Sequence, residues 1–216
     1  MLLLTVVVVI TAVNAVKSGE WSTWSPLWMC GHGLSGATVG IVGLGRIGFA
    51  VAQRLRPFAV SRIIYTDHEE KSYAADVSAE FVPFDVLLAQ SDFVTACCPL
   101  STETTNLFNA ATFSRMKRTS VFVNVGRGEI VNEPDLYDAL KMGVIAAAGL
   151  DVTTPEPLPV DHQYCVILPH IGSATTEART AMLLLSRNFT LLLETSCQPC
   201  PANQCHVRFT FRHFSC

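Results

Sequence analysis

The 216-residue chain has few charged residues and no region rich in basic ones. Charged side chains make up 15% of the sequence, and the formal net charge is −3. Proteins that bind nucleic acid cluster Lys and Arg on one face, so this composition argues against a nucleic-acid partner. The chain also lacks an internal repeat and a low-complexity tract, which argues against a solenoid or a disordered chain. Half of its residues are apolar, enough to bury a core.

No hydrophobic run is as long as the roughly 20 residues that cross a membrane. The longest, residues 1–15, ends in Val13-Asn14-Ala15, which resembles a signal-peptide cleavage site, but no Lys or Arg precedes it. Two interpretations remain open: a signal peptide over residues 1–15, or a helix over residues 2–18 that packs against the protein. Since no other feature indicates export, the sequence favours a cytoplasmic protein without a membrane partner.

The eight cysteines do not form the pattern of a disulfide framework. Four are scattered through the body of the chain and are predicted to be small core residues: Cys30, Cys97, Cys98 and Cys165. The other four crowd the tail, where Cys197-x-x-Cys200 lacks the second ligand pair of a zinc site. We therefore predict no metal, and a poorly ordered, Cys-rich tail over residues 189–216.

The stretch TVGIVGLGRIG, residues 38–48, has the pattern of a dinucleotide-binding turn. An apolar strand leads into G-x-G-x-x-G, and a helix follows, which is the context that the motif requires. Gly43 would permit the tight turn, Gly45 would let a pyrophosphate approach the backbone, and Gly48 would let the helix pack against the strand. The N–H groups at the helix start, including those of Arg46 and Ile47, would face the phosphates.

The acidic residue expected in such a domain is Asp67, which lies 24 residues after Gly43 and ends a second apolar run. In this position a carboxylate accepts hydrogen bonds from the adenosine ribose. It would also repel the 2′-phosphate of NADP, whereas the neighbouring His68 could contact that phosphate. The sequence therefore leaves the cofactor open between NAD and NADP.

Apolar runs that read as buried strands alternate with helical segments along the chain. Strands are expected at residues 38–42, 62–67, 81–82, 93–98, 121–125, 145–150 and 165–168, and helices at 50–55, 72–79, 85–90, 109–117, 134–141 and 175–193. This alternation predicts an α/β fold, a doubly wound parallel sheet of six or seven strands with a Rossmann-like dinucleotide-binding domain.

Three chemically reactive side chains follow predicted strands, where ligands bind in open α/β sheets. Arg127 stands between two glycines and is suited to grip a carboxylate with two hydrogen bonds. Glu156 lies between two prolines that restrict its backbone, and His170 follows the last strand. A single such residue would have little meaning, but three at successive strand ends indicate a reactive site.

The segments GLGRIG, NVGRGEIV, GLDVTTPEP and LPHIGSAT occur in this order. Together they resemble the D-2-hydroxyacid dehydrogenase family, over about residues 17 to 188. The resemblance implies an oxidoreductase that transfers a hydride from NADH or NADPH to a small 2-oxo acid of the glyoxylate or hydroxypyruvate class. In that family the substrate site lies between two domains, and the second domain would be largely missing from this chain.

The resemblance also implies roles for individual residues. Arg127, Glu156 and His170 match the catalytic set: Arg127 would hold the substrate carboxylate, His170 would donate a proton to the substrate oxygen, and Glu156 would hydrogen-bond the other ring nitrogen. A nearby carboxylate favours the charged imidazole that such a donor needs. Further matches are Asp151 at the nicotinamide end, the cofactor-lining residues Pro99, Val125 and Gly172, and Ser173 beside Arg127 and His170 at the substrate.

Two functional readings follow for this chain. One is an active reductase with the Arg-Glu-His set, and the other is a non-catalytic NAD(P)-binding fragment whose open cleft cannot turn over substrate. Expected segments are a linker or dimerisation helix at residues 1–20, the dinucleotide-binding domain at 21–188 and the tail at 189–216. Trp21, Trp24 and Trp28 form either a homodimer contact or a loop anchored on the protein's own core.

Overall fold

A computed structural model describes residues 12–26, 28, 30–154 and 165–184 of the chain. The chain divides into two compact units between Gly172 and Ser173. The first contains a parallel sheet with its helices, and the second contains a helical stretch at residues 176–184. The domain boundaries expected at residues 20 and 188 stay predictions, and the tail at 189–216 lies outside the described residues.

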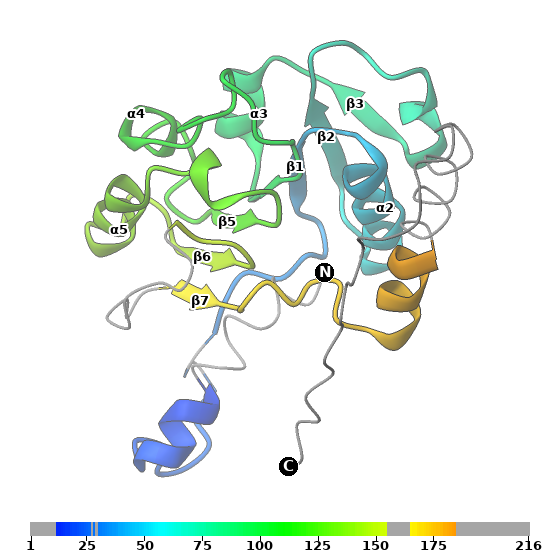
Figure 1. Ribbon diagram of the computed structural model, residues 1–216. Coiled ribbons are helices and arrows are strands. Elements are labelled where there is room, and N and C mark those ends of the chain that lie inside the picture. The colour runs from blue at the N-terminus through cyan, green and yellow to red at the C-terminus, as the bar shows by residue number, and fades with distance from the viewer. Residues whose placement is uncertain (1–11, 27, 29, 155–164, 185–216) are drawn as a thin grey trace, which may run out of the picture. The chain divides into compact units, whose positions relative to one another are not determined.

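Seven parallel strands form the sheet, in the order β3-β2-β1-β4-β5-β6-β7. They are β1 (Thr38–Val42), β2 (Arg62–Thr66), β3 (Ala79–Phe81), β4 (Phe93–Ala96), β5 (Val121–Asn124), β6 (Ala147–Leu150) and β7 (Cys165–Ile167). The order runs outward from β1 in both directions, and helical segments lie on the described connections from β1 through to β6 (Figure 1). This confirms the predicted doubly wound parallel sheet, and the switch point lies between β1 and β4.

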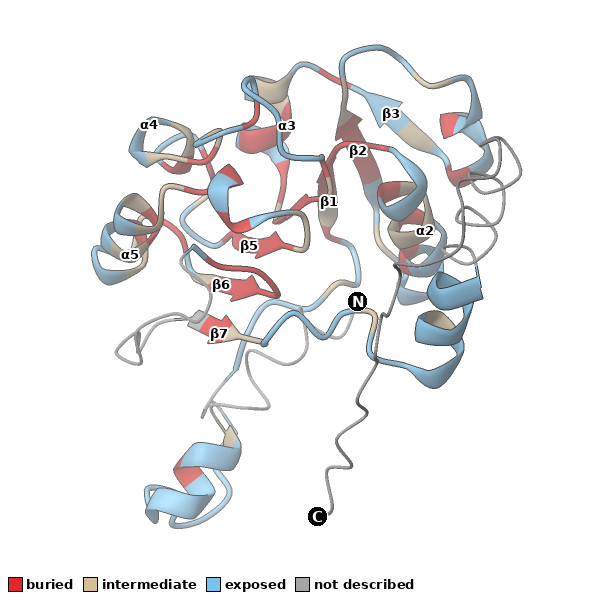
Figure 2. Ribbon diagram, viewed as in Figure 1, coloured by how far each residue is buried: buried red, intermediate tan, exposed pale blue. Residues whose placement is uncertain are grey.

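Helices cover both faces of the sheet. They are α2 (Arg46–Leu55), α3 (Phe84–Gln90), α4 (Ala110–Phe113) and α5 (Glu133–Lys141), with the 3-10 helices η1 (Arg56–Phe58), η2 (Ser72–Val77) and η3 (Gly128–Ile130). Successive strand residues point to opposite faces. Thus Ile41 packs with α2 and η2, whereas Val42 packs with α3. The sheet is red through its middle in Figure 2 because both faces are buried.

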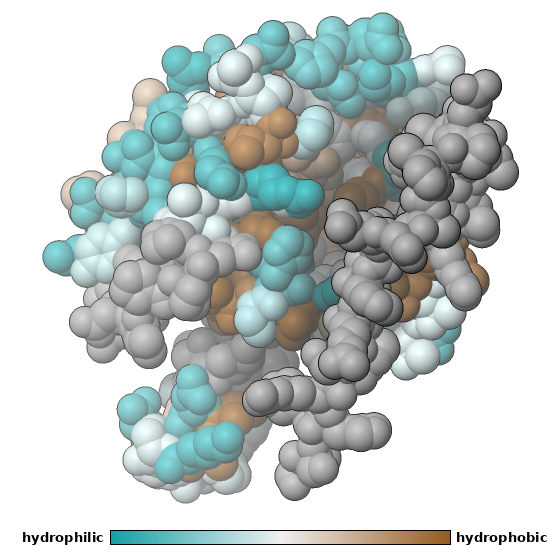
Figure 3. Space-filling model, in the orientation of Figure 1, coloured by the Kyte–Doolittle hydropathy of each residue, from teal (hydrophilic) through white to brown (hydrophobic). Residues whose placement is uncertain are grey.

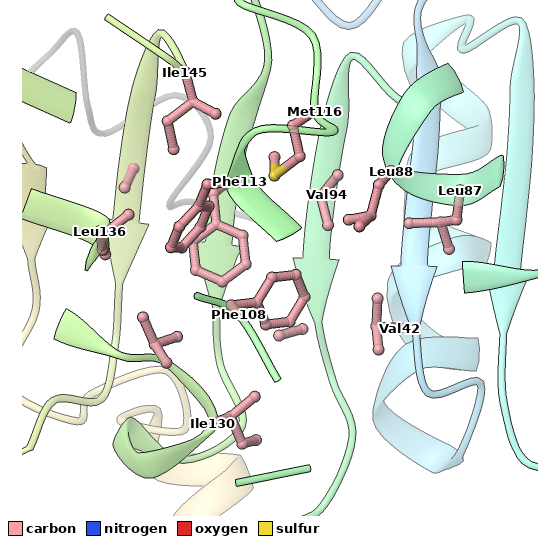
Figure 4. Packing of buried hydrophobic residues seen from close by; sticks show 14 of the residues in the cluster. Val42, Leu87, Leu88, Val94, Phe108, Phe113, Met116, Ile130, Leu136 and Ile145 are labelled. Carbon is pink, nitrogen blue, oxygen red and sulfur yellow. The ribbon is translucent and has the colours of Figure 1, made fainter. Parts of the chain in front are cut away.

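An aromatic cluster forms the centre of one face (Figure 4). Phe108, Phe113 and Phe122 are fully buried, and the rings of Phe108 and Phe122 lie 4.5 Å apart between centroids. Burying one such side chain contributes about 1.5–3 kcal/mol. The central strands are buried up to their carboxyl ends, where the glycines and polar residues of the predicted site begin.

Two sequence expectations are corrected by the structure. The helix expected at 109–117 is only the four residues of α4, which Asn109 and Thr112 begin with a capping box. The N–H groups of Arg115 and Met116 bond three residues back, to Thr112 and Phe113, and these tight turns end the helix. Cys30 is exposed rather than in the core, whereas Cys98 is buried as expected.

The N-terminal segment is described from residue 12 onward. Residues 12–18 are helical, as expected for part of the 2–18 segment. None of the helices in the described ranges is both long enough and apolar enough to cross a bilayer.

Candidate functional site

The chain leaves every strand at the same edge of the sheet, because all seven strands are parallel. The predicted site residues lie on them: the glycine turn after β1, Asp67 after β2, Pro99 after β4, Arg127 after β5, Asp151 after β6 and His170 after β7. Arg127 and His170 therefore follow the two strands that flank β6. The carboxyl edge of an open α/β sheet is where such folds bind ligands.

Two of the three motif glycines are required by close packing. Gly43 has φ +91°, and a Cβ there would lie 2.8 Å from the backbone N and Cα of Cys98. A Cβ on Gly48 would lie 2.1 Å from the carbonyl oxygen of Gly43. Any side chain at either position would push the turn away from β4 or from the helix. The roles predicted for Gly43 and Gly48 agree with this geometry.

Gly45 is different, because an added Cβ would meet no atom within 4 Å. Gly45 is the N-cap residue of α2, and within the described part of the chain no side chain caps that helix or adds an acidic group to its first turn. Arg46 and Ile47, which follow, are exposed. The start of α2 therefore offers backbone N–H groups and the positive end of a helix dipole toward open space. These residues fit a dinucleotide pyrophosphate.

Asp67 faces the glycine turn from the end of β2. Its Oδ2 accepts a hydrogen bond from Leu44 N at 2.9 Å, and its Oδ1 accepts one from His68 N at 2.8 Å. Lys71 Nζ lies 3.7 Å from Oδ1. The hydrogen bond to Glu69 and the charge of Asp67 raise the pKa of Lys71, which stays protonated at neutral pH. The sequence indicated a ribose partner here, but carried no sign that the carboxylate also holds the turn.

His68, the other candidate for cofactor selection, is exposed and lies near a carboxylate. Its Nδ1 is 3.8 Å from Glu103 Oε2. Acidic side chains thus come from two loops at this end of β2, Asp67 and Glu69 from one and Glu103 from the other. Figure 3 shows that hydrophilic side chains predominate over the edge of the molecule that carries α3 and β3.

Cys97 and Cys98, directly before Pro99, provide no reactive thiolate. Burial raises the pKa of Cys97 to about 12. Burial also raises the pKa of Cys98, more than its backbone hydrogen bond lowers it. Both thiols stay protonated at neutral pH and act as packing groups beside the turn. The exposed Pro99 follows them, and its carbonyl accepts a hydrogen bond from Thr104 Oγ1 at 2.7 Å.

Asn124, the last residue of β5, shapes the loop that carries Arg127. The Asn124 side chain is fully buried; its Oδ1 accepts from Gly126 N at 3.0 Å and its Nδ2 donates to the Arg127 carbonyl at 2.8 Å. The Arg127 side chain is exposed, and Nη1 donates to the Gly126 carbonyl at 2.7 Å. Val125 between them is half-buried. The Asn124 side chain thus fixes the backbone of this loop at the sheet edge, and the loop carries the Arg127 guanidinium at the surface.

Asp151 holds the segment that contains His170. Its side chain is 5% exposed, its Oδ1 accepts from Ile171 N at 2.9 Å, and its Oδ2 accepts from Gly172 N at 2.8 Å. A Cβ on Gly172 would lie 2.6 Å from that Oδ2. His170 itself is exposed and has φ +53°, an unusual backbone conformation for a histidine. The sequence did not reveal this clamp of two hydrogen bonds, since Ile171 and Gly172 lie 20 and 21 residues after Asp151.

Two predicted residues cannot be placed beside the others. Glu156 lies outside the described residues, as do residues 155–164 around it. Ser173 begins the second compact unit. Among the described residues, no group of three or more His, Cys, Asp and Glu side chains could hold a metal ion. The four tail cysteines, at 197, 200, 205 and 216, fall outside that search.

Known proteins resemble this chain in both sequence and fold. It is 56% identical to mouse "Glyoxylate reductase/hydroxypyruvate reductase" over 183 residues, 82% of this chain and 56% of that protein. The human protein of the same name is 52% identical over 197 residues, 88% of this chain and 60% of that protein. A solved glyoxylate reductase from Paecilomyes thermophila aligns with a TM-score of 0.76 and 35% identity, covering 85% of this chain and 56% of that one.

The matches cover only part of each relative. The chain spans between half and two thirds of the length of the curated relatives it matches. Residues 1–172 match the family model "D-isomer specific 2-hydroxyacid dehydrogenase, NAD binding domain", the same residues that form the first compact unit. The sheet order, the glycine turn and this match agree, and the chain belongs to the D-isomer specific 2-hydroxyacid dehydrogenase family.

Proposed function

We propose that the chain binds a nicotinamide dinucleotide at the carboxyl edge of its sheet and reduces a small 2-oxo acid of the glyoxylate or hydroxypyruvate class. The observation that supports binding most directly is the open space at Gly45, in a turn whose other two motif glycines are closely packed. That space lies at the start of α2, where unpaired N–H groups attract phosphate. Relatives named as glyoxylate reductases support the substrate class.

In this proposal the residues divide the work along the sheet edge. Gly43, Gly45, Arg46, Ile47 and Gly48 form the pyrophosphate cradle. Asp67 accepts from the adenosine ribose, and the cofactor's other contacts are His68, Pro99, Val125, Asp151 and Gly172. The bound nicotinamide supplies the hydride.

The remaining residues act on the substrate. Arg127 binds the substrate carboxylate and draws electron density from the adjacent carbonyl. His170 donates a proton to the carbonyl oxygen, and Glu156 stabilises the protonated imidazole. The rigid loop at Arg127 and the clamp on the His170 segment support these assignments, because proton transfer needs a fixed donor.

The acidic residues at the end of β2 favour NADH over NADPH in this proposal. The 2′-phosphate of NADPH would carry its charge toward Asp67, Glu69 and Glu103, with Lys71 already paired to two of them. The negative charges of these carboxylates would repel the 2′-phosphate and so weaken NADPH binding. Exposure and salt weaken that effect at Glu69 and Glu103, so we expect a preference of about tenfold rather than exclusion.

Binding and turnover can be tested with the purified 216-residue chain. We expect NADH fluorescence to report saturable binding, tighter than for NADPH, and glyoxylate or hydroxypyruvate to cause NADH oxidation. His170→Ala should keep NADH binding and lower turnover by about 100-fold or more, as expected for loss of a general acid. Binding with no turnover above the His170→Ala variant would instead support a non-catalytic NAD(P)-binding fragment. A chain that binds neither nucleotide would contradict both.

We further propose that the chain forms a homodimer through residues 12–28. Trp21, Trp24 and Trp28 are 49%, 78% and 40% exposed, and Val13 and Val16 on the helical stretch 12–18 are also exposed. Exposed aromatic residues this close together are typical of protein interfaces. We expect sedimentation velocity to show a dimer at micromolar concentration, and Trp24→Ser to weaken it about tenfold or more. A wild-type monomer at those concentrations would contradict the proposal.

A cytoplasmic location completes the proposal. It is supported by the free thiols of Cys30, Cys97 and Cys98, which suit a reducing compartment. A mature protein that begins at Val16 would contradict it, since that would show removal of residues 1–15 as a signal peptide.

A further inference from the structure

Leu44, the middle residue of the turn between Gly43 and Gly45, is held through both of its backbone polar groups. Its N–H donates to Asp67 Oδ2 at 2.9 Å, and its carbonyl oxygen accepts from the Tyr73 hydroxyl at 2.8 Å. The Leu44 side chain is fully buried. Both partners belong to the segment after β2, so the turn after β1 takes its shape from a neighbouring connection.

Tyr73 is itself held in place. It lies in the first turn of η2, whose Ala74 and Val77 are buried in the same cluster as Leu44. Its ring forms a T-shaped pair with that of Phe49 on α2, with centroids 5.5 Å apart and an interplanar angle of 83°. The preceding Lys71 N donates to the buried Tyr65 hydroxyl at 2.7 Å. The Tyr73 hydroxyl therefore has a fixed approach to the turn.

The hydrogen bond to the Leu44 carbonyl also orients the N–H of the next residue, Gly45. The carbonyl of Leu44 and the N–H of Gly45 belong to one planar peptide unit, and in a trans peptide they point in opposite directions. Fixing the carbonyl thus fixes the direction of the Gly45 N–H. Gly45 is the motif glycine at which an added Cβ would meet no atom within 4 Å, at the N-cap of α2.

We propose that Tyr73 is a positioning residue for the phosphate-binding turn: its hydroxyl sets the Leu44–Gly45 peptide so that the Gly45 N–H faces a dinucleotide pyrophosphate. The proposal rests on the dinucleotide binding proposed above. Asp67 contributes from the other side of Leu44, so one connection holds both the ribose partner and the turn. Tyr73 touches neither the substrate nor the reacting atoms.

Tyr73→Phe tests this cleanly, because it removes the hydroxyl and keeps the ring that packs on Phe49. Without ligand, we expect the Gly45 and Arg46 amides to exchange hydrogen about three- to tenfold faster, while β1 amides stay unchanged. Affinity for ADP should fall by a similar factor, the equivalent of one hydrogen bond. Affinity for adenosine, which lacks the pyrophosphate, should stay within about twofold, because a hydroxyl that acts only through the turn affects only phosphate.

Tyr137→Phe on α5 is the matched control, since it removes a phenol hydroxyl far from the turn in the sheet order. It should change neither the exchange of the Gly45 and Arg46 amides nor the affinity for ADP relative to adenosine. Equal losses of ADP and adenosine affinity in Tyr73→Phe, or unchanged amide exchange, would overturn the proposal. If the wild-type chain bound no ADP, dinucleotide binding would be refuted, and the exchange rates would still decide whether Tyr73 orders the turn.

Discussion

Adding one methyl group to Gly45 should lower dinucleotide affinity with little loss of stability, whereas the same change at Gly48 should lower both affinity and stability. At Gly45 the methyl group meets nothing within 4 Å, so the free energy of unfolding should change by less than about 1 kcal/mol. It would, however, occupy the space into which the pyrophosphate must come. We expect NADH and ADP affinity to fall at least about tenfold.

Gly48→Ala is the matched comparison in the same turn. Its methyl group would lie 2.1 Å from the Gly43 carbonyl oxygen, so α2 must shift away from β1. Overpacking of this kind costs about 1–3 kcal/mol. Urea denaturation and NADH titration of the two variants check both parts. Equal destabilisation by the two substitutions, or unchanged affinity in Gly45→Ala, would contradict the role that we assign to the open glycine.

The second large effect is expected at Asp151. Asp151→Asn keeps one acceptor oxygen, so one of the N–H groups of Ile171 and Gly172 faces an amide NH₂ instead of a carboxylate oxygen. Because hydrogen bonds to charged groups contribute about 1.5–3 kcal/mol, we expect the free energy of unfolding to fall by about 2 kcal/mol. The amides of Ile171 and Gly172 should exchange faster, and any reductase activity should drop, since His170 adjoins them.

Asp138→Asn provides the control for this experiment, because it makes the same change of charge at an exposed position on α5. It should leave stability within about 0.5 kcal/mol of wild type. If Asp151→Asn matched this control in both stability and amide exchange, the two backbone hydrogen bonds would have no role in holding the His170 segment.

Much of the site could be predicted because its signals are local in sequence. The glycine spacing predicted a turn between strand and helix, and the runs before Arg127, Asp151 and His170 predicted strands that end where polar residues begin. In a sheet of parallel strands those ends share one edge, so the prediction of a common site needed no contact information. The end of α4 was missed, because the N–H groups of Arg115 and Met116 bond three residues back and so end the helix after Phe113.

The hydrogen bonds that shape the site could not be predicted in the same way. Asp67 to Leu44 spans 23 residues, Tyr73 to Leu44 spans 29, and Asp151 to Gly172 spans 21. Which carboxylate oxygen meets which N–H depends on strand order and register, and these arise from packing of the whole sheet. The identity of a side chain tells which groups it can bind, but the partner that it meets depends on the fold.

The sequence by itself thus determined the alternation of strands and helices, the glycine turn and the family, because each depends on residues near one another along the chain. Only the tertiary structure decided that Gly45 is open while Gly43 and Gly48 are closed. It also decided that Asp67 and Tyr73 hold one turn, and that Asp151 holds the His170 segment. These depend on atoms brought together by parallel pairing of distant strands, which apolar burial on both faces of the sheet stabilises.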